Sequence, residues 1–262
     1  MDELDSELHR LALSSYEEFA DIADYIWKCP NLIESETKIE IEKLKEYFPL
    51  KGDSKHDETA RRFRKIRWQH EGRKLRGVFP YVMANGNLFT CISVFETYCL
   101  MLCKAIEKRS NIALSECKGL GISRCFNFLS RVPIDLNRLS FRREVLSAIL
   151  IRNCLFHASG ILEWSRDKDE LRRIVAKRTY WSDYTRSKIS EQESLDVSIV
   201  NTKLGDQLQI TNEYSHVVSN YLKFQFIDLC KKSQLACNKK CTIELPTTPY
   251  YLHTRQAASD AS

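Results

Sequence analysis

The chain has 262 residues, of which 43% are hydrophobic and 29% charged, and its formal net charge is +5. This composition is typical of a globular protein and excludes a disordered one. With only eight glycines and six prolines, the chain favours long helices over a many-stranded sandwich. The acidic start, and the lack of any run near the ~18 apolar residues of a membrane span, predict a cytoplasmic protein without a signal peptide.

The ten cysteines are expected to be free thiols. Disulfides are rare in a reducing compartment, and several of the cysteines lie in apolar helical runs, where a thiol behaves as a small buried hydrophobe. No C-x-x-C pair occurs, and Cys237 and Cys241 have no second pair or nearby histidine to complete a zinc site. We therefore expect no metal and no cofactor.

The hydrophobic periodicity predicts long helices in the first half of the chain. Two amphipathic helices, 1–28 and 33–48, are expected to be separated near Pro30. A further helix is predicted over residues 61–77. The Asn-Gly-Asn sequence at 85–87 is then expected to open a strongly apolar helix that runs to about Arg109 and is buried nearly all round.

The second half of the chain has a more varied pattern. Its expected elements are a loop with short helical pieces at 110–135, a second apolar helix at 136–159, a polar helix at 166–178, a β-hairpin of 194–200 and 207–211, and a last helix at 213–233. Gly160 is a suitable end signal for the second apolar helix. The fold class is therefore mainly α, a helical bundle with a small β-hairpin before the last helix. We divide the chain into an N-terminal helical extension (1–80), a core (81–234) and a C-terminal tail (235–262) that is extended or disordered.

A dense basic segment lies within the N-terminal extension. It spans residues 61–76, and Glu71 is its only acidic residue. Eight of its sixteen residues are basic: Arg61, Arg62, Arg64, Lys65, Arg67, Arg73, Lys74 and Arg76. Phe63 and Trp68 are interleaved with these cations, which suits packing or stacking beside a phosphate backbone. The alternative is a solvated helix face.

The end of the second apolar helix is the most informative part of the sequence. Arg152, Asn153 and His157 lie there among apolar residues, where polar groups are costly unless they have partners. An arginine and a histidine suit phosphate chemistry, one as a fixed cation and the other as a proton carrier. The spacing alone carries little, because this composition gives about half a match by chance. The alternative is that Arg152 extends to solvent and His157 interacts with the helix C-terminus.

The sequence Arg152-Asn153-Cys154-Leu155-Phe156-His157, followed by Gly160, resembles the Arg-Asn-x-x-x-His signature of the HEPN superfamily. The resemblance extends to the buried helix 88–107 with Phe95-Glu96-Thr97-Tyr98, which is similar to the first core helix of that family. The hairpin ending Leu208-Gln209-Ile210-Thr211 and the closing helix resemble the ending of larger prokaryotic members. The resemblance covers residues 81–234 and does not include the basic N-terminal third.

This resemblance implies a homodimeric helical bundle that acts as a metal-independent endoribonuclease, as a toxin or defence factor with a cognate antitoxin. Carried over to this chain, Arg152, Asn153 and His157 would form a catalytic site shared between two chains. Glu96 could neutralise or position Arg152, or simply reach solvent, and the basic segment 61–76 could extend the RNA cleft. Two alternatives stay open: a non-catalytic HEPN module that binds RNA or nucleotides, and a helical protein–protein interaction domain. In that last case, Arg152 and His157 would be separated or paired within the fold.

Overall fold

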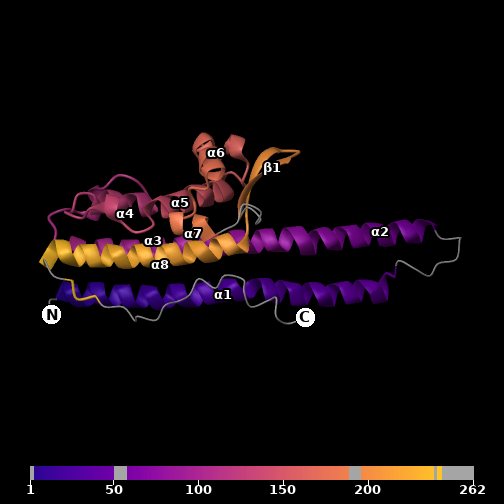
Figure 1. The fold of residues 1–262 in the computed structure, drawn as a ribbon, viewed down its shortest axis with the longest axis horizontal. Coiled ribbons are helices and arrows are strands. Elements are labelled where there is room, and N and C mark those ends of the chain that lie inside the picture. Colours follow the sequence, from indigo (N-terminus) through magenta and orange to yellow (C-terminus); the bar gives the residue numbers. More distant parts are fainter. Residues whose placement is uncertain (1–2, 50–57, 189–195, 239–240, 244–262) are drawn as a thin grey trace.

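The computed structural model describes residues 3–49, 58–188, 196–238 and 241–243. The fold is mainly α with one antiparallel hairpin before the last helix, as predicted (Figure 1). The α-helices and strands are α1 (Glu3–Tyr47), α2 (Glu58–Arg73), α3 (Phe79–Glu107), α4 (Gly121–Leu129), α5 (Arg142–His157), α6 (Lys168–Lys177), α7 (Asp183–Lys188), β1 (Val197–Thr202), β2 (Gly205–Ile210) and α8 (Asn212–Asn238). The short helix α7 was not predicted.

The core consists of α1, α3 and α8 packed side by side, with α5 against α8 and α3, and α4 against α3. Aromatic rings link these helices; the Phe95 ring, for example, lies edge-on to Phe226 with 6.4 Å between centroids. The apolar residues on the core side of α3 are buried: Leu88, Ile92, Phe95, Cys99, Leu102 and Ile106. Burial all round α3 was wrong, however, because Thr90, Ser93 and Thr97 form an exposed stripe. This stripe leaves one face of α3 open to solvent.

The predicted break near Pro30 does not occur, and α1 continues to Tyr47. A proline has no N–H, so the carbonyl of Ile26 lacks its helical donor. The side chain of Asn212 supplies the replacement, because its Nδ2 donates to the Ile26 oxygen at 2.7 Å. Asn87 Nδ2 in turn donates to Asn212 Oδ1 at 2.7 Å, within a buried network. A tertiary contact with α8 thus stabilises the helix where the local sequence disfavours it.

The helices predicted at 61–77 and 85–109 are one continuous helical run. A π-helical turn, Lys74–Val78, joins α2 to α3. Pro80 comes just after this turn, and because a proline has no N–H it interrupts the regular helical hydrogen bonding there. Asn85 and Asn87 are buried on α3, so the Asn-Gly-Asn sequence packs against other helices and does not cap a helix.

Helix 58–107 is long and apolar enough to cross a membrane by length and composition alone, and half of its most apolar window is buried inside the fold. The core helix of a soluble protein passes the same test.

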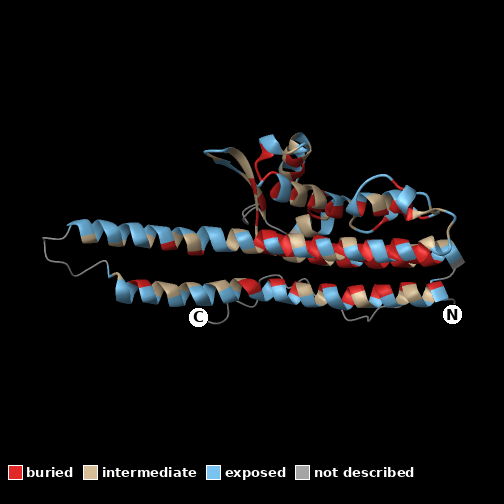
Figure 2. Cartoon of the chain, turned by 180° about the vertical axis from the view of Figure 1, so that it is seen from behind, coloured by how far each residue is buried: buried red, intermediate tan, exposed pale blue. Residues whose placement is uncertain are grey.

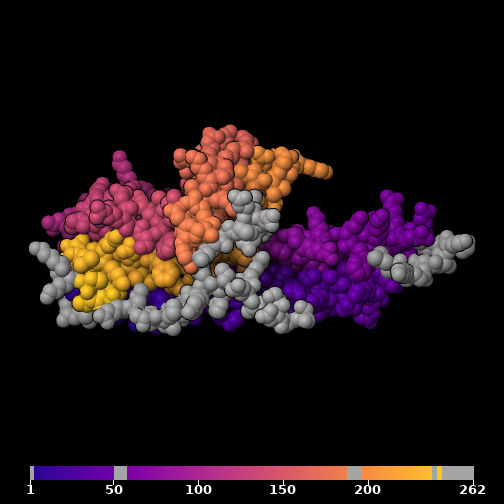
Figure 3. Space-filling model, in the orientation of Figure 1, coloured from indigo at the N-terminus to yellow at the C-terminus, as the bar shows by residue number. Residues whose placement is uncertain are grey.

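The distal part of α1 and all of α2 project beyond the core as a two-helix arm, residues 31–48 and 58–78 (Figures 1 and 3). Trp68 Nε1 donates to the Phe48 carbonyl at 2.9 Å, and the Phe48 and Phe63 rings are 6.3 Å apart. Burial is concentrated in the core and is sparse along the arm (Figure 2). The first half of α1 packs within the core. The part that lies outside the core is therefore the arm, and not the whole of the predicted N-terminal extension, 1–80.

The hairpin packs at the end of α5. Val197 of β1 lies opposite Ile210 of β2, and the Leu208 N–H donates to the Gly160 carbonyl at 2.8 Å. The tail was predicted over 235–262, but residues 235–238 belong to α8, so that part of the prediction is wrong. The rest of the tail lies outside the described residues, apart from 241–243. There the Thr242 N–H donates to Gln234 Oε1 at 2.9 Å.

Candidate functional site

Arg152 lies on α5 and faces α3. Its Nη2 is 3.6 Å from Glu96 Oε2, and the two side chains are 22% and 37% exposed. Such a partly buried pair fixes the guanidinium more firmly than a fully exposed one. Of the two roles considered for Glu96, the structure therefore selects the one in which it pairs with Arg152.

The N-terminus of α4 lies close to the Glu96 carboxylate. A Cβ at Gly121, the first residue of α4, would lie 2.9 Å from Glu96 Cδ, and Gly121 has φ +55°. The carboxylate thus rests against backbone that only glycine leaves open, at the positive end of the helix dipole. This contact was not predicted from the sequence. Glu96 joins three elements, α3, α4 and α5, at one point.

Asn153 and His157 lie on the open side of α5. Asn153 is half-buried and His157 is exposed, and within the described residues neither side chain forms a hydrogen bond or an ion pair. The His157 ring lies edge-on to Phe156 with 5.0 Å between centroids, and Phe156 lies edge-on to Phe89 of α3 at 5.5 Å. Phe156 is 62% exposed, so an aromatic surface adjoins the histidine.

The polypeptide just after His157 is tightly held. The Gly160 N–H donates to the Cys154 carbonyl at 3.1 Å, and Ser159 and Gly160 both have positive φ, 50° and 78°. A Cβ at Gly160 would lie 2.8 Å from the Leu208 carbonyl oxygen. The hairpin therefore fixes the end of α5, and with it the position of His157.

A single chain does not bring Arg152 and His157 to one point. At about 100° per residue, their side chains leave α5 about 140° apart. Arg152 points toward α3, whereas His157 lies on the far side of Asn153. One chain therefore presents a spread surface and not a closed site.

The basic segment is also distant from α5. Arg67 and Lys74 pair with the buried Glu71, and Arg64 is half-buried. The remaining five cations are exposed and form no ion pair within the described part of the chain: Arg61, Arg62, Lys65, Arg73 and Arg76. At 1.5 Å per residue, these cations lie about 20 to 42 Å along the helix from Phe89, the α3 residue that contacts Phe156.

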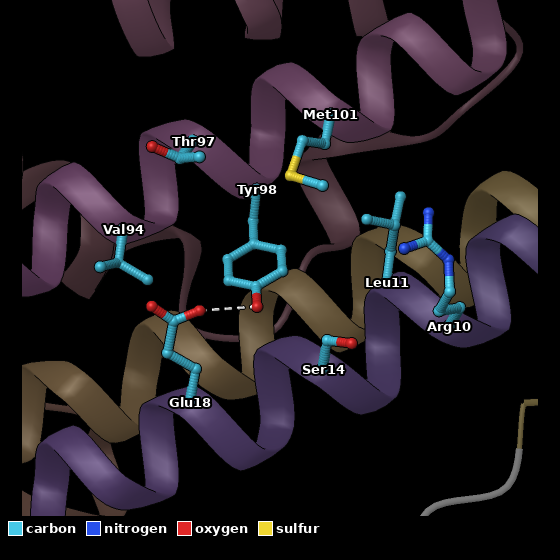
Figure 4. Close-up of a pocket in the computed structure, with 8 residues that line it drawn as sticks. All are labelled: Arg10, Leu11, Ser14, Glu18, Val94, Thr97, Tyr98 and Met101. Atoms are coloured by element: carbon cyan, nitrogen blue, oxygen red, sulfur yellow. Dashed lines mark hydrogen bonds between the residues drawn. The ribbon is translucent and has the colours of Figure 1, made fainter.

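A hollow of about 310 Å³ lies between α1 and α3 (Figure 4). Tyr98 reaches across from α3, and its hydroxyl donates to Glu18 Oε2 at 2.7 Å. Burial, together with this carboxylate, raises the pKa of Tyr98. Neither Arg152 nor His157 lines the hollow, so this bond ties two core helices together and is not part of the surface on α5.

The described structure has no cluster of metal-ligating side chains, and most of its thiols are buried. No group of three or more His, Cys, Asp or Glu side chains is placed there to hold a metal ion. Eight of the ten cysteines are buried, and no disulfide joins the cysteines of the described residues. Burial raises the pKa of the Cys91 thiol to about 12, so this thiol stays protonated at neutral pH.

Comparisons with models of protein families, with curated proteins and with solved structures found no match to this chain.

Proposed function

We propose that this protein is a metal-independent endoribonuclease of the HEPN type, with Arg152, Asn153 and His157 as its catalytic residues. The observation that carries the proposal is that all three polar groups reach the surface at the end of a core helix. His157 is exposed, and Arg152 and Asn153 are partly exposed, so a phosphate of the RNA backbone can approach this end of α5. The contact with β2 that holds the end of α5 suits a site whose histidine must be well positioned.

The chemistry requires nothing beyond RNA and these side chains. The 2′-OH attacks the adjacent phosphorus, a bond from O2′ to phosphorus forms, and the bond to the 5′-oxygen breaks. His157 accepts the 2′-OH proton or donates one to the leaving 5′-oxygen. Arg152 holds the non-bridging oxygens, and Asn153 donates a hydrogen bond to the phosphate or orients His157. The products are a 2′,3′-cyclic phosphate and a 5′-OH.

The complete site is proposed to form between two copies of the chain. The separation of Arg152 and His157 around α5 supports this, because a two-fold mate can bring the arginine of one chain to the histidine of the other. Phe156 and the exposed stripe of small residues on α3 offer a surface for such a mate.

The exposed cations of the arm are proposed to bind RNA away from the point of cleavage. Their affinity for RNA should fall steeply as the salt concentration rises, because each neutralised phosphate releases counterions. A role as a cytoplasmic toxin or defence factor, with an antitoxin that restrains it, completes the proposal.

A second candidate function is a non-catalytic module that binds RNA. The contact between Arg152 and Glu96 favours it, because a guanidinium already paired within the fold is less available to a phosphate. The same pair would also suit a protein-interaction domain, which would not bind RNA at all.

One experiment separates these functions. The purified chain is incubated with mixed RNA in EDTA, beside Arg152→Ala and His157→Ala. We expect cleavage to a 2′,3′-cyclic phosphate, slowed by at least ~100-fold in either variant. Arg166→Ala and His9→Ala change the same residue types outside α5 and should leave the rate unchanged.

Cleavage that survives both α5 substitutions would refute the catalytic assignment. RNA binding without cleavage by the unaltered chain would establish the second function. The absence of both would leave the protein-interaction domain.

A further inference from the structure

A second cavity, of about 450 Å³, lies where α1, α7 and α8 meet. None of the proposed catalytic residues lines it. Five aromatic residues do: Trp27, Phe141, Tyr184, Tyr221 and Phe224. Its size and aromatic walls are those of a small-molecule site, which typically occupies ~300–1,000 Å³.

The inner wall of the cavity is rigid. Phe141 has φ +55°, an unfavourable conformation for a bulky side chain, and its ring stacks on Tyr221 at 4.7 Å between centroids. The Tyr221 hydroxyl accepts from the Ser182 N–H at 3.1 Å and lies 2.9 Å from Thr185 Oγ1. Strained residues of this kind persist where the surrounding structure holds them, and they gather at binding sites.

The rim of the cavity exposes aromatic rings to water. Trp27 is 44% exposed, Tyr184 62% and Phe224 41%. Three such rings around one hollow form an apolar patch that a ligand would cover. A flat aromatic group, which can pack between rings, fits these walls best.

One lysine, Lys223, and one aspartate, Asp24, line the cavity. Lys223 is only 1% exposed, and its Nζ lies 5.2 Å from the centroid of Tyr16 and 5.1 Å from that of Phe224. Burial lowers the pKa of Lys223, because the protein interior solvates its charge poorly. At the rim, Asp24 is exposed and already paired with Lys28 at 2.5 Å. A carboxylate bound beside Lys223 would stabilise the ammonium form that burial disfavours, whereas Asp24 lies in water and is paired.

We propose that this cavity binds a small planar aromatic carboxylate, with its ring among the aromatic side chains and its carboxylate toward Lys223. Asn220 and His216 also line the cavity and can donate hydrogen bonds. The ligand would touch Phe141, the residue that precedes α5.

Calorimetric titration of the full chain tests this with three probes of one shape: 2-naphthoate, neutral 2-naphthamide and the cation 2-naphthylmethylammonium. We expect 2-naphthoate to bind with one-to-one stoichiometry and a Kd at least about ten-fold lower than that of 2-naphthamide. Lys223→Met should remove this preference while leaving the affinity for 2-naphthamide unchanged. Tyr184→Ala, at an exposed position on the rim, should weaken both complexes.

Trp164→Ala is the matched control, because this ring is 66% exposed and lies outside the cavity. It should change neither affinity. The proposal is overturned if 2-naphthoate does not bind, if it binds no more tightly than the other two probes, or if its preference survives Lys223→Met. Because the readout is binding alone, the result is independent of any ribonuclease activity.

Discussion

Replacing Asn212 with alanine removes the side chain that lets α1 pass through Pro30. Asn212 is buried, its Nδ2 donates to the Ile26 carbonyl, and its Oδ1 accepts from Asn87, both at 2.7 Å. Asn212→Ala leaves a buried carbonyl and a buried amide without partners. Each unsatisfied group costs about 1–3 kcal/mol, so the free energy of unfolding should fall by about 2–5 kcal/mol.

The physical reason can be isolated by changing Pro30 as well. In a Pro30→Ala chain, residue 30 has an N–H that can bond to the Ile26 carbonyl in the ordinary helical manner. Asn212→Ala then leaves only the Asn87 amide unsatisfied. Its cost in this background should be smaller by about 1–2 kcal/mol, and this difference is the coupling energy between positions 30 and 212.

Urea unfolding followed by helical circular dichroism, at one protein concentration, gives the four free energies. Asn220→Ala is the control, because Asn220 is on the same helix and its Nδ2 donates to the His216 carbonyl of that helix, at 3.2 Å. Its cost should be the same in the unaltered chain and in the Pro30→Ala chain. If Asn212→Ala also cost the same in both backgrounds, within about 0.5 kcal/mol, Asn212 would not be replacing the missing donor.

Four other outcomes follow from the described contacts. Gly160→Ala places a Cβ 2.8 Å from the Leu208 oxygen, at φ +78°. The urea midpoint of this variant should fall by an amount equivalent to about 1–3 kcal/mol. In the control, Gly86→Ala, the new Cβ meets nothing within 4 Å, so the midpoint should not fall. Gly121→Ala should push the Glu96 carboxylate away from Arg152, so a crystal structure of this variant in which the 3.6 Å pair persists would contradict the role assigned to Gly121. Lys74, followed by His70 and Arg67, lowers the pKa of Glu71, so the ionised form stabilises the fold above about pH 4.3 and this contribution is lost as the pH falls through the lowered pKa. The difference in unfolding free energy between the unaltered chain and Glu71→Gln should shrink over that acidic range, and a difference independent of pH would argue against it. Finally, mixing Arg152→Ala with His157→Ala should restore about a quarter of the ribonuclease rate, since half the dimers are mixed and each holds one intact site; no recovery would mean that each chain supplies its own site.

The elements that the sequence predicted well are those whose own pattern defines them. The apolar spacing of α3, the glycine after α5 and the alternation of the hairpin strands are local signals, and the structure contains all three elements. Pro30 and the Asn-Gly-Asn sequence are equally local signals, yet both predicted helix boundaries were wrong. The reason is the same in both cases, because Asn87 and Asn212 form a tertiary network that outweighs local preference.

In the candidate site, too, some features could be predicted from the sequence and others could not. The position of Asn153 and His157 on one face of α5 follows from their four-residue spacing along the helix. The contact of Glu96 with Arg152 was one of two alternatives, and only the packing of α3 against α5 decides between them. The distance between the basic segment and α5 could not be predicted, because it depends on α2 and α3 forming one continuous helix.

The π-helical turn at 74–78 sets the phase between the two parts of that helix. Such a turn holds one more residue than a regular α-helical turn, and that extra residue shifts every later side chain by about 100° around the axis. Loss of a single residue there would leave both helices intact while turning the cations of the arm to a different side of the core. The direction in which the arm presents its positive charge therefore depends on the number of residues in this single turn.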